Sequence, residues 1–181
     1  MSKTPLLQPV VPQADQAMVD EIFGGVEAHV GFIPDGMKLY SISPPVLQTF
    51  VQGVGYFLGH ESLSQELLAM IRYLGSSDAG CEFCISLNEG FLANMGVDLD
   101  SVRAARSNPD AAPLTDEEKV LLKLALKGIT AADDISAENI ENARNAGWND
   151  RQIFDVVALA ANNRAFNLVL KTFNVEAQGV Y

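Results

Sequence analysis

The two cysteines of this chain, Cys81 and Cys84, lie three residues apart in the segment GCEFCISLNEG, and its 181 residues contain no others. A C-x-x-C pair suits three roles: a dithiol–disulfide couple, part of a zinc site, or two small core residues. In a helix, residues three apart share one face about one turn from each other, so the two sulfurs can meet with little backbone movement. The spacing favours redox chemistry and leaves the other two roles open.

The residues around the pair predict how it is presented. Gly80 and the polar run before it predict that Cys81 lies at or just before the first turn of a helix, where free N–H groups and the helix dipole favour a thiolate. Asn88 lies on the same face in a largely apolar stripe, so its amide must be hydrogen-bonded. Zinc is disfavoured because it needs about four ligands, and His29 and His60 lie well upstream without a paired spacing.

The elements that must position these residues are predicted to be helices. Apolar residues recur at helical spacing, two-residue alternation is scarce, and Thr115 with Glu118 forms the pattern of a capping box. We expect one all-α domain over 1–181, a helical bundle, with 1–14 as an extended N-terminal arm and 60–100 as a core hairpin. Further helices are expected over 14–29, about 45–58 and 81–95, in DLDSVRAARS, and in the last third of the chain, where Asn149 is an expected N-cap.

Composition narrows the classes of partner. The chain has 12 basic and 23 acidic residues, a net charge of −11, and no basic cluster, which argues against nucleic acid and anionic membranes. Its apolar runs are broken well before the roughly 20 residues of a membrane span, and its beginning lacks a signal-peptide pattern. We expect a cytoplasmic, reducing compartment, where C-x-x-C is more often catalytic than a structural disulfide. No nucleotide, haem or flavin motif is present, so no cofactor is expected.

Two segments together resemble a known family. LSQELLAMIRYL followed by GCEFCISLNEGFLANMGVDLDSV is similar to the carboxymuconolactone decarboxylase-like superfamily, in particular its alkyl hydroperoxidase D branch and the peroxidase-related subgroup. The segment from LTDEEKVLLKLALKGIT to VLKTFNV extends the resemblance, which covers about residues 30–176. It implies an all-α fold that forms homo-oligomers, commonly trimers or hexamers.

The resemblance also implies a mechanism. Cys84 would attack a peroxide, and Cys81, the more exposed thiol, would resolve the sulfenic acid and then exchange with a thiol reductant protein. A glutamate and a histidine relay the proton in the family, but this chain has Asn88 at the histidine position, and an amide cannot take up a proton near neutral pH. The glutamate position holds Ala69, and Glu66, one turn earlier, is the nearest candidate.

Two other charged side chains enter the interpretation. Arg72 is expected either to pair with Glu66 or to lie near the thiols, and His60 is a candidate replacement base. Glu66 has an alternative role as a favourable charge in the first turn of its helix.

Three functions remain open from the sequence. The first is a C-x-x-C oxidoreductase that reduces a peroxide or exchanges a disulfide, with activity weakened by Asn88. The second is a lactone decarboxylase of the same superfamily, which fits poorly because such members lack C-x-x-C and keep a histidine base. The third is a non-catalytic helical oligomer with residual cysteines.

Overall fold

The computed structural model describes residues 4–176, and every regular element in that range is a helix, which confirms the predicted all-α fold. Short 3₁₀ turns occupy Gln13–Asp15, Pro109–Ala111 and Ala132–Asp134. The α-helices are α1 (Gln16–Val30), α2 (Asp35–Tyr40), α3 (Pro44–Leu58), α4 (Gln65–Ala79), α5 (Glu82–Asn94), α6 (Leu99–Ala104), α7 (Asp116–Thr130), α8 (Ala137–Asn145) and α9 (Asp150–Thr172).

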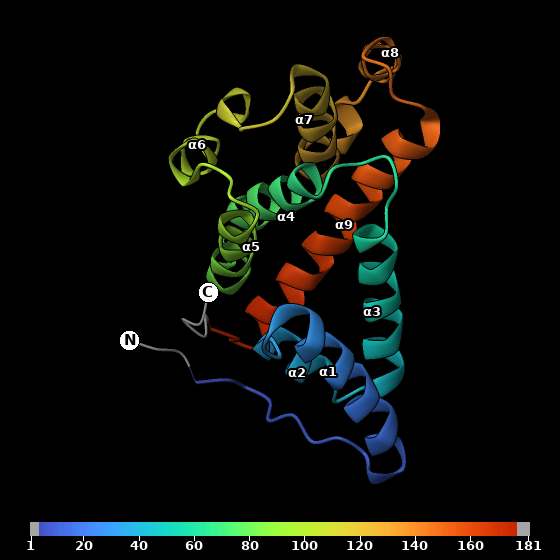
Figure 1. Ribbon diagram of the computed structural model, residues 1–181, viewed down its shortest axis with the longest axis vertical. Coiled ribbons are helices and arrows are strands. Elements are labelled where there is room, and N and C mark those ends of the chain that lie inside the picture. The colour runs from blue at the N-terminus through green and yellow to red at the C-terminus, as the bar shows by residue number, and fades with distance from the viewer. Residues whose placement is uncertain (1–3, 177–181) are drawn as a thin grey trace.

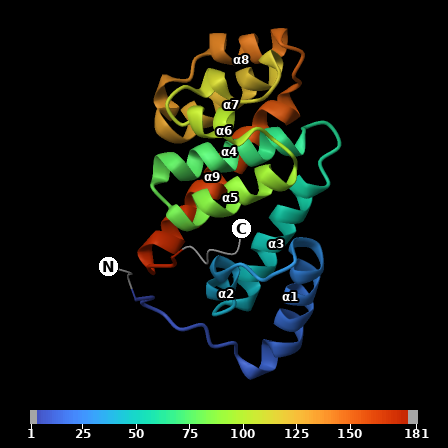
Figure 2. The ribbon, with the colours of Figure 1, turned by 60° about the vertical axis from the view of Figure 1, so that its left-hand side comes forward.

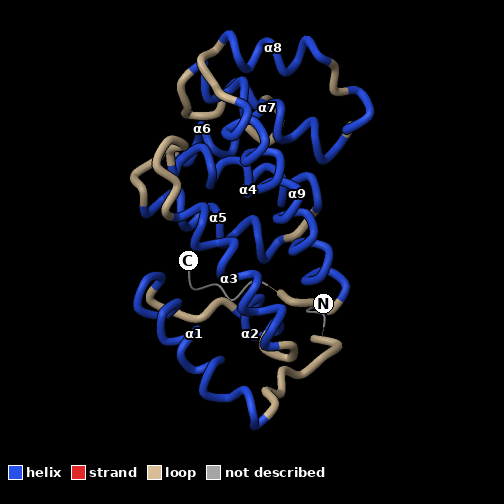
Figure 3. The backbone as a smooth tube through the Cα atoms, turned by 90° about the vertical axis from the view of Figure 1, so that its right-hand side faces the viewer, coloured by secondary structure: helices blue, strands red, loops and turns tan. Residues whose placement is uncertain are grey.

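The helices form an elongated molecule with three parts (Figures 1 and 2). Helices α4, α5 and α9 make the middle, α1 to α3 form one end, and α6 to α8 form the other. Helix α4 packs against α5, α9 and α7, whereas α3 packs chiefly against α1 and α2. Figure 3 shows the same order from the side, with loops in the connections and in the segment before α1. The cysteines at the start of α5 therefore lie in the middle part, next to its junction with α2.

Side-chain caps begin the helices where the sequence predicts. Ser64 starts α4 by accepting a hydrogen bond from the backbone N–H of Leu67 at 3.1 Å. Thr115 and Glu118 exchange the two hydrogen bonds of a capping box at the start of α7. Asn149 caps α9 in the same way. Each cap satisfies backbone N–H groups that have no partner within their own helix, which explains why the predicted starts are confirmed.

Helix α4 is the buried support of the fold. Four of its apolar side chains are buried in the core shared with α5, α7 and α9: Leu67, Leu68, Ile71 and Leu74. Burial of a leucine or isoleucine side chain contributes about 1.5–3 kcal/mol. The position of α4 is therefore strongly fixed, and with it the position of the turn that leads to the cysteines.

Helix α9 is the most apolar long helix of the described residues. Its 23 residues are, by length and composition alone, long and apolar enough to cross a bilayer. Half of its most apolar window is buried inside the protein, where α9 contacts α4 and α7. Two buried asparagines, Asn163 and Asn167, interrupt it. Its apolar character is explained by its place in the core.

The predicted N-terminal arm is seen from residue 4, and residues 1–3 lie outside the described part. Residues 4–12 form no helix, and the backbone N–H of Leu6 donates to the carbonyl of Phe173 at 3.0 Å. The first 3₁₀ turn begins at Gln13 and leads into α1. The arm thus runs back to the end of α9, near the dithiol.

Candidate active site: the dithiol at the start of α5

The backbone turn between α4 and α5 sets the position of Cys81. Gly80 adopts a left-handed conformation with φ +61°, and its N–H donates to the carbonyl of Ser77 at 3.0 Å. The N–H of Cys81 then donates to the carbonyl of Ser76 at 3.0 Å, which completes a Schellman-type end for α4. Cys81 is consequently the N-cap of α5, as the sequence predicts.

The two cysteines are close enough to form a bond. Their Cα atoms lie 5.3 Å apart, and the structure joins them as a disulfide. This separation falls within the usual range for disulfides, so oxidation of the pair needs little movement of the backbone. Cys84 is the third residue of α5, so both sulfurs belong to the first turn, where the helix dipole favours negative charge.

Both cysteines are buried, so exposure does not distinguish Cys81 from Cys84 within one chain. Cys81 is 2% exposed and Cys84 is 1% exposed. Both belong to an apolar cluster that also contains Leu39 of α2, Phe83 of α5, and Phe166 and Leu170 of α9. We call these six residues the dithiol cluster. Its helices come from distant parts of the sequence, so local sequence does not reveal that Cys81 is covered.

Gly36 allows α2 to approach the dithiol cluster closely. A Cβ atom at this position would lie 2.8 Å from Cζ of Phe166 and 2.9 Å from Cδ1 of Leu170. Such distances are too short for carbon atoms, so any larger residue would push α2 away. The absence of a side chain at Gly36 therefore helps to close the site.

Two aromatic rings, Tyr40 and Phe50, pack against Phe166 of the dithiol cluster. Phe50 stacks on Phe166 with ring centroids 4.7 Å apart, and Tyr40 lies 5.1 Å from Phe50 and 5.3 Å from Phe166. Tyr40 and Phe50 are partly buried against the cluster. Burial raises the pKa of Tyr40 above 10.0, so its phenol stays neutral at neutral pH. This aromatic flank, Tyr40, Phe50 and Phe166, gives the dithiol an apolar neighbourhood.

Asn88 bridges two helices beside the dithiol. It is 4% exposed, and its Nδ2 donates to the carbonyl of Cys84 at 2.8 Å. Its Oδ1 accepts a hydrogen bond from Nε of Arg72 at 3.1 Å. The prediction that this buried amide must be hydrogen-bonded is confirmed. Both bonds orient the side chain, and neither gives it a proton to transfer.

Arg72, on α4, donates to Asn88, and Asn88 lies one turn along α5 from Cys84. Burial lowers the pKa of Arg72 to about 10, so the guanidinium remains protonated at neutral pH. Among the described residues no carboxylate lies within ion-pair distance of it, and it does not pair with Glu66. Within residues 4–176 this positive charge thus has no partner of opposite charge.

Buried amides from α9 fix the back of the site. Nδ2 of Asn163 donates to the carbonyl of Arg72 and to Oγ of Ser76, both at 3.2 Å. Nδ2 of Asn167 donates to the same Oγ at 3.1 Å. A buried amide or hydroxyl without partners would cost about 1–3 kcal/mol, so this network strongly favours one alignment of α9 on α4.

Glu89 anchors the other side of α5, and the sequence interpretation missed it. Its carboxylate accepts hydrogen bonds at 3.0 Å from Tyr73, from Nε of Arg103 and from Arg106. Burial opposes ionisation of Glu89, but the hydrogen bonds from Arg103 and Tyr73 outweigh it and hold its pKa below 4.5. The partners come from α4 and from α6 and the loop after it, so no local pattern identifies them. Glu89 holds Asn88, its neighbour, in register with Arg72.

Comparison with known proteins places this arrangement in a known fold. No family model and no curated protein matches the chain. A peroxidase-related protein from Silicibacter sp. TM1040 superposes with a TM-score of 0.88 at 23% identity, over 99% of this chain and 95% of that one. A second, described as an alkylhydroperoxidase AhpD core from Ralstonia eutropha JMP134, gives 0.83 at 19% identity, over 98% and 95%. The chain has the alkyl hydroperoxidase D-like fold.

A third structure with this fold carries a different activity. A cysteine-to-alanine variant of the debrominase Bmp8, in complex with 2,3,4-tribromopyrrole, superposes with a TM-score of 0.81 at 19% identity, over 99% of this chain and 95% of that one. The alkyl hydroperoxidase D-like fold therefore supports more than one reaction.

Glu66, the nearest candidate for the glutamate that the alkyl hydroperoxidase D-like resemblance implies, lies far from the thiols. Cys81 is level with Ser76 on α4, because their backbone groups are hydrogen-bonded. Glu66 precedes Ser76 by ten residues, which corresponds to about 15 Å along a helix axis. Glu66 lies in the first turn of α4, where its charge is favourable. Within one chain, the structure brings Cys81, Cys84, Asn88 and Arg72 together and leaves Glu66 apart.

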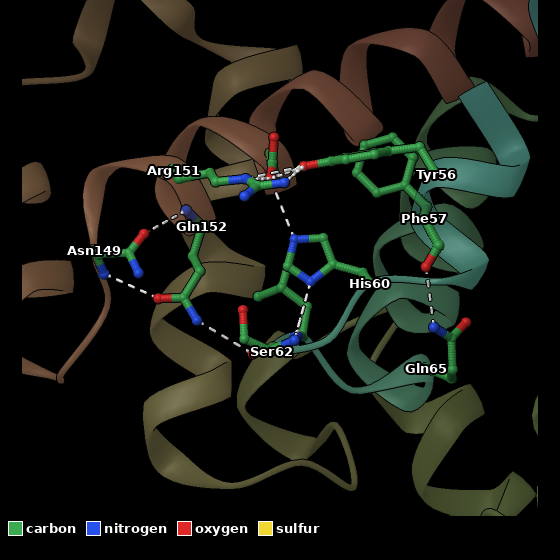
Figure 4. Close-up of polar contacts among 10 residues, drawn as sticks. Tyr56, Phe57, His60, Ser62, Gln65, Asn149, Arg151 and Gln152 are labelled. Atoms are coloured by element: carbon green, nitrogen blue, oxygen red, sulfur yellow. Dashed lines mark hydrogen bonds and ion pairs between the residues drawn. The ribbon is translucent and has the colours of Figure 1, made fainter. Parts of the chain in front are cut away.

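His60 belongs to a separate cluster, shown in Figure 4. Its Nε2 lies 3.2 Å from Oδ2 of Asp155, and its Nδ1 accepts the backbone N–H of Leu63 at 3.1 Å. Tyr56 donates to the same Oδ2 at 2.6 Å and accepts from Arg151 at 3.0 Å. The cluster joins the end of α3 to the start of α9, at the end of α4 opposite the cysteines. His60 is not placed to replace the missing base.

Metal binding finds no support at either place. Within residues 4–176, no group of three or more histidine, cysteine, aspartate or glutamate side chains is arranged to hold a metal ion.

Proposed function

We propose that this protein is a thiol-dependent oxidoreductase that reduces a peroxide through Cys84 and Cys81. The observation that carries the proposal is the paired dithiol in the first turn of α5, within an alkyl hydroperoxidase D-like fold. The pair is the arrangement that a dithiol–disulfide cycle requires, and the first turn favours the thiolate that reacts.

The cycle consumes one peroxide for each pair of thiols. The Cys84 thiol first releases its proton to solvent, and the thiolate attacks the outer oxygen of the peroxide, which breaks the O–O bond. Cys84 becomes a sulfenic acid, and the alkoxide that leaves takes a proton from solvent. The Cys81 thiol then forms the S–S bond and releases water. A dithiol reductant supplies the two electrons that restore the pair.

Proton transfer is the weak part of this site. Asn88 cannot accept a proton, and Arg72 is already protonated at neutral pH. The thiolate depends on the helix dipole and on nearby positive charge, so we expect slower peroxide turnover than in a site with a histidine base. The same absence of a histidine base disfavours lactone decarboxylation.

The burial of the pair bears on its partners. Both cysteines are buried, which favours a small oxidant over a protein disulfide in the first step. Reduction by a thiol protein then requires α2 or the N-terminal arm to move. We place the cycle in a reducing compartment such as the cytoplasm, where such reductants act.

Removal of halogen from an aromatic ring is a second candidate. The observation that favours it is the aromatic flank beside the dithiol, together with the similarity in fold to the debrominase. The balance is one aryl bromide and two thiols giving the arene, one disulfide, bromide and a proton. Release of bromide from a brominated pyrrole by the reduced protein would support this candidate, and no release at saturating substrate would reject it.

A titration tests the peroxide proposal. Reduced protein is mixed with an organic hydroperoxide, and free thiols are counted after denaturation. We expect one equivalent to remove both thiols and to produce a Cys81–Cys84 disulfide, identified by peptide mass. The Cys84→Ser variant should react far more slowly. If both thiols survive excess peroxide in the folded protein, the proposal fails and a non-catalytic role for the cysteines is left.

We also propose that the chain forms a homo-oligomer through α9. Phe154 is 71% exposed and Leu168 is 54% exposed, unusually high for apolar residues of a core helix. They belong to an apolar stripe with coiled-coil spacing, formed by Phe154, Ala158, Ala161, Ala165 and Leu168. Phe154→Glu should lower the mass measured by analytical ultracentrifugation, and an unchanged mass would exclude this surface.

A further inference from the structure

The positive charges near the dithiol differ from those elsewhere in the molecule. Most lysine and arginine side chains in the described range lie within 4.0 Å of a carboxylate. Arg72, Lys127 and Lys171 do not. Lys127 bonds to Asn139 at the far end of the molecule, but the other two flank the dithiol. Arg72 contacts Asn88, and Lys171 donates to the carbonyl of Ala79, two residues before Cys81.

Arg72 has unused hydrogen-bonding capacity. Its Nε is occupied by Asn88, and its two terminal amino groups have no protein partner in residues 4–176. No fully buried side-chain nitrogen or oxygen in that range lacks a partner, so these amino groups are not fully buried. A guanidinium with one edge fixed and with terminal groups that are not fully buried is oriented to accept an anion in a forked, bidentate geometry.

The unpaired charge of Arg72 destabilises the folded state. A half-buried guanidinium without a carboxylate loses hydration and gains no ion pair in return. The chain as a whole carries a net charge of −11 and repels anions at its surface. An unpaired cation beside a reactive dithiol, in an otherwise acidic protein, is explained if an anionic ligand supplies the missing ion-pair partner.

We propose that Arg72 binds the carboxylate of the substrate, and that the substrate is a hydroperoxide with a carboxylate at one end and an apolar body. The inference rests on the proposed peroxide reduction. The carboxylate would pair with the terminal amino groups of Arg72, and the apolar body would lie on the aromatic flank formed by Tyr40, Phe50 and Phe166. Asn88 holds the guanidinium in place, so it is a positioning residue.

The test compares two oxidants that differ in one charge. Reduced protein is mixed with a medium-chain fatty acid hydroperoxide or with its methyl ester, below micelle-forming concentrations, and the rate of thiol loss is followed. A charged hydrogen bond contributes about 1.5–3 kcal/mol, so the acid should react about 10-fold to 100-fold faster than the ester. Equal rates in the wild type would overturn the proposal.

Three variants separate the effect of Arg72 on the carboxylate from general electrostatics. Arg72→Gln keeps an N–H donor for Asn88 but removes the charge, so the rate with the acid should fall by more than the rate with the ester, and the two rates should become equal. Lys127→Met removes another unpaired cation far from the dithiol and should leave the preference intact. Arg72→Lys, which keeps the charge, should retain part of the preference if Arg72→Gln does not fold. A full preference in Arg72→Gln would overturn the proposal.

A binding measurement distinguishes failure of this inference from failure of peroxide reduction. The matching hydroxy acid, which cannot oxidise thiols, is titrated into the reduced protein by calorimetry. If neither hydroperoxide reacts, the proposed function fails, but binding of the hydroxy acid that is lost in Arg72→Gln would still support carboxylate recognition. No binding to the wild type would overturn it.

Discussion

Arg72 donates a hydrogen bond from Nε to Oδ1 of Asn88 across 3.1 Å, beside the dithiol. Asn88 in turn donates to the carbonyl of Cys84 at 2.8 Å, so the pair connects α4 to the first turns of α5. The family resemblance implies a histidine that transfers protons at this place. This chain has the amide of Asn88 and the guanidinium of Arg72 there, and neither group transfers a proton near neutral pH. The arrangement can bind and orient an anion, but it cannot serve as a general base near neutral pH.

Replacing Asn88 by histidine should add the missing base. If Cys84 is the attacking thiol, Asn88→His should raise the rate of thiol oxidation by an organic hydroperoxide about 100-fold or more, because general base catalysis contributes about 10²–10⁴-fold. Asn88→Gln is the matched control, since it keeps the amide and adds no base. An unchanged rate in folded Asn88→His would count against Cys84 as the attacking residue.

Gly80→Ala should destabilise the turn that positions Cys81. An alanine in the left-handed conformation of this residue costs about 1–2 kcal/mol, and relief of that strain would shift the start of α5. We expect a lower free energy of unfolding in urea and slower disulfide formation. Gly53→Ala is the control, because Gly53 lies inside α3 with open space around it. It should be neutral or stabilising and leave disulfide formation unchanged, and the same result for Gly80→Ala would refute this role of the turn.

His60→Ala should affect stability without affecting chemistry. His60 links the backbone of a loop to Asp155, and loss of these hydrogen bonds should cost about 1–3 kcal/mol although Tyr56 still donates to Asp155. Because the cluster lies at the opposite end of α4 from Cys81, the rate of thiol oxidation should stay within about twofold of the wild type in conditions where both remain folded. A loss of rate of more than about tenfold would show that His60 reaches the reaction after all.

Glu89→Gln should reveal a stability difference that depends on pH. The folded pKa of Glu89 lies below 4.5, so its ionised form stabilises the folded chain fully above that value. The contribution is lost as the pH falls through the lower folded value. We expect the free energy of unfolding in urea to be about 1 kcal/mol higher for the wild type than for the variant near neutral pH. This difference should disappear in acid. A difference that grows in acid would contradict the assigned role.

Local signals explain why much of the fold was predictable. Ser64, Thr115 and Asn149 each satisfy backbone N–H groups within the next three residues, so the starts of α4, α7 and α9 are specified by short segments of sequence. Gly80 stops α4 for an equally local reason. The position of Cys81 as the N-cap of α5 follows from these neighbours and needed no knowledge of the rest of the chain.

The parts of the site that the sequence did not predict depend on contacts between distant segments. Arg72 and Asn88 lie 16 residues apart on different helices, and only the packing of α4 on α5 brings them together. Cys81 and Cys84 are covered by α2 and α9, whose residues lie far away along the chain, so the burial of the pair could not be predicted from its neighbours. Glu66 is near the cysteines in sequence, yet the length of α4 separates it from them.

The most direct test of the redox assignment is to trap the intermediate on Cys84. In Cys81→Ser, the sulfenic acid formed by peroxide cannot be resolved within the chain, so a sulfenate-specific reagent should label it. We predict label on Cys84 in this variant after one equivalent of an organic hydroperoxide, located by peptide mass, and little label on Cys81 in Cys84→Ser. Label on Cys81 alone, or unmodified Cys84 under conditions that oxidise an unfolded control, would contradict the account.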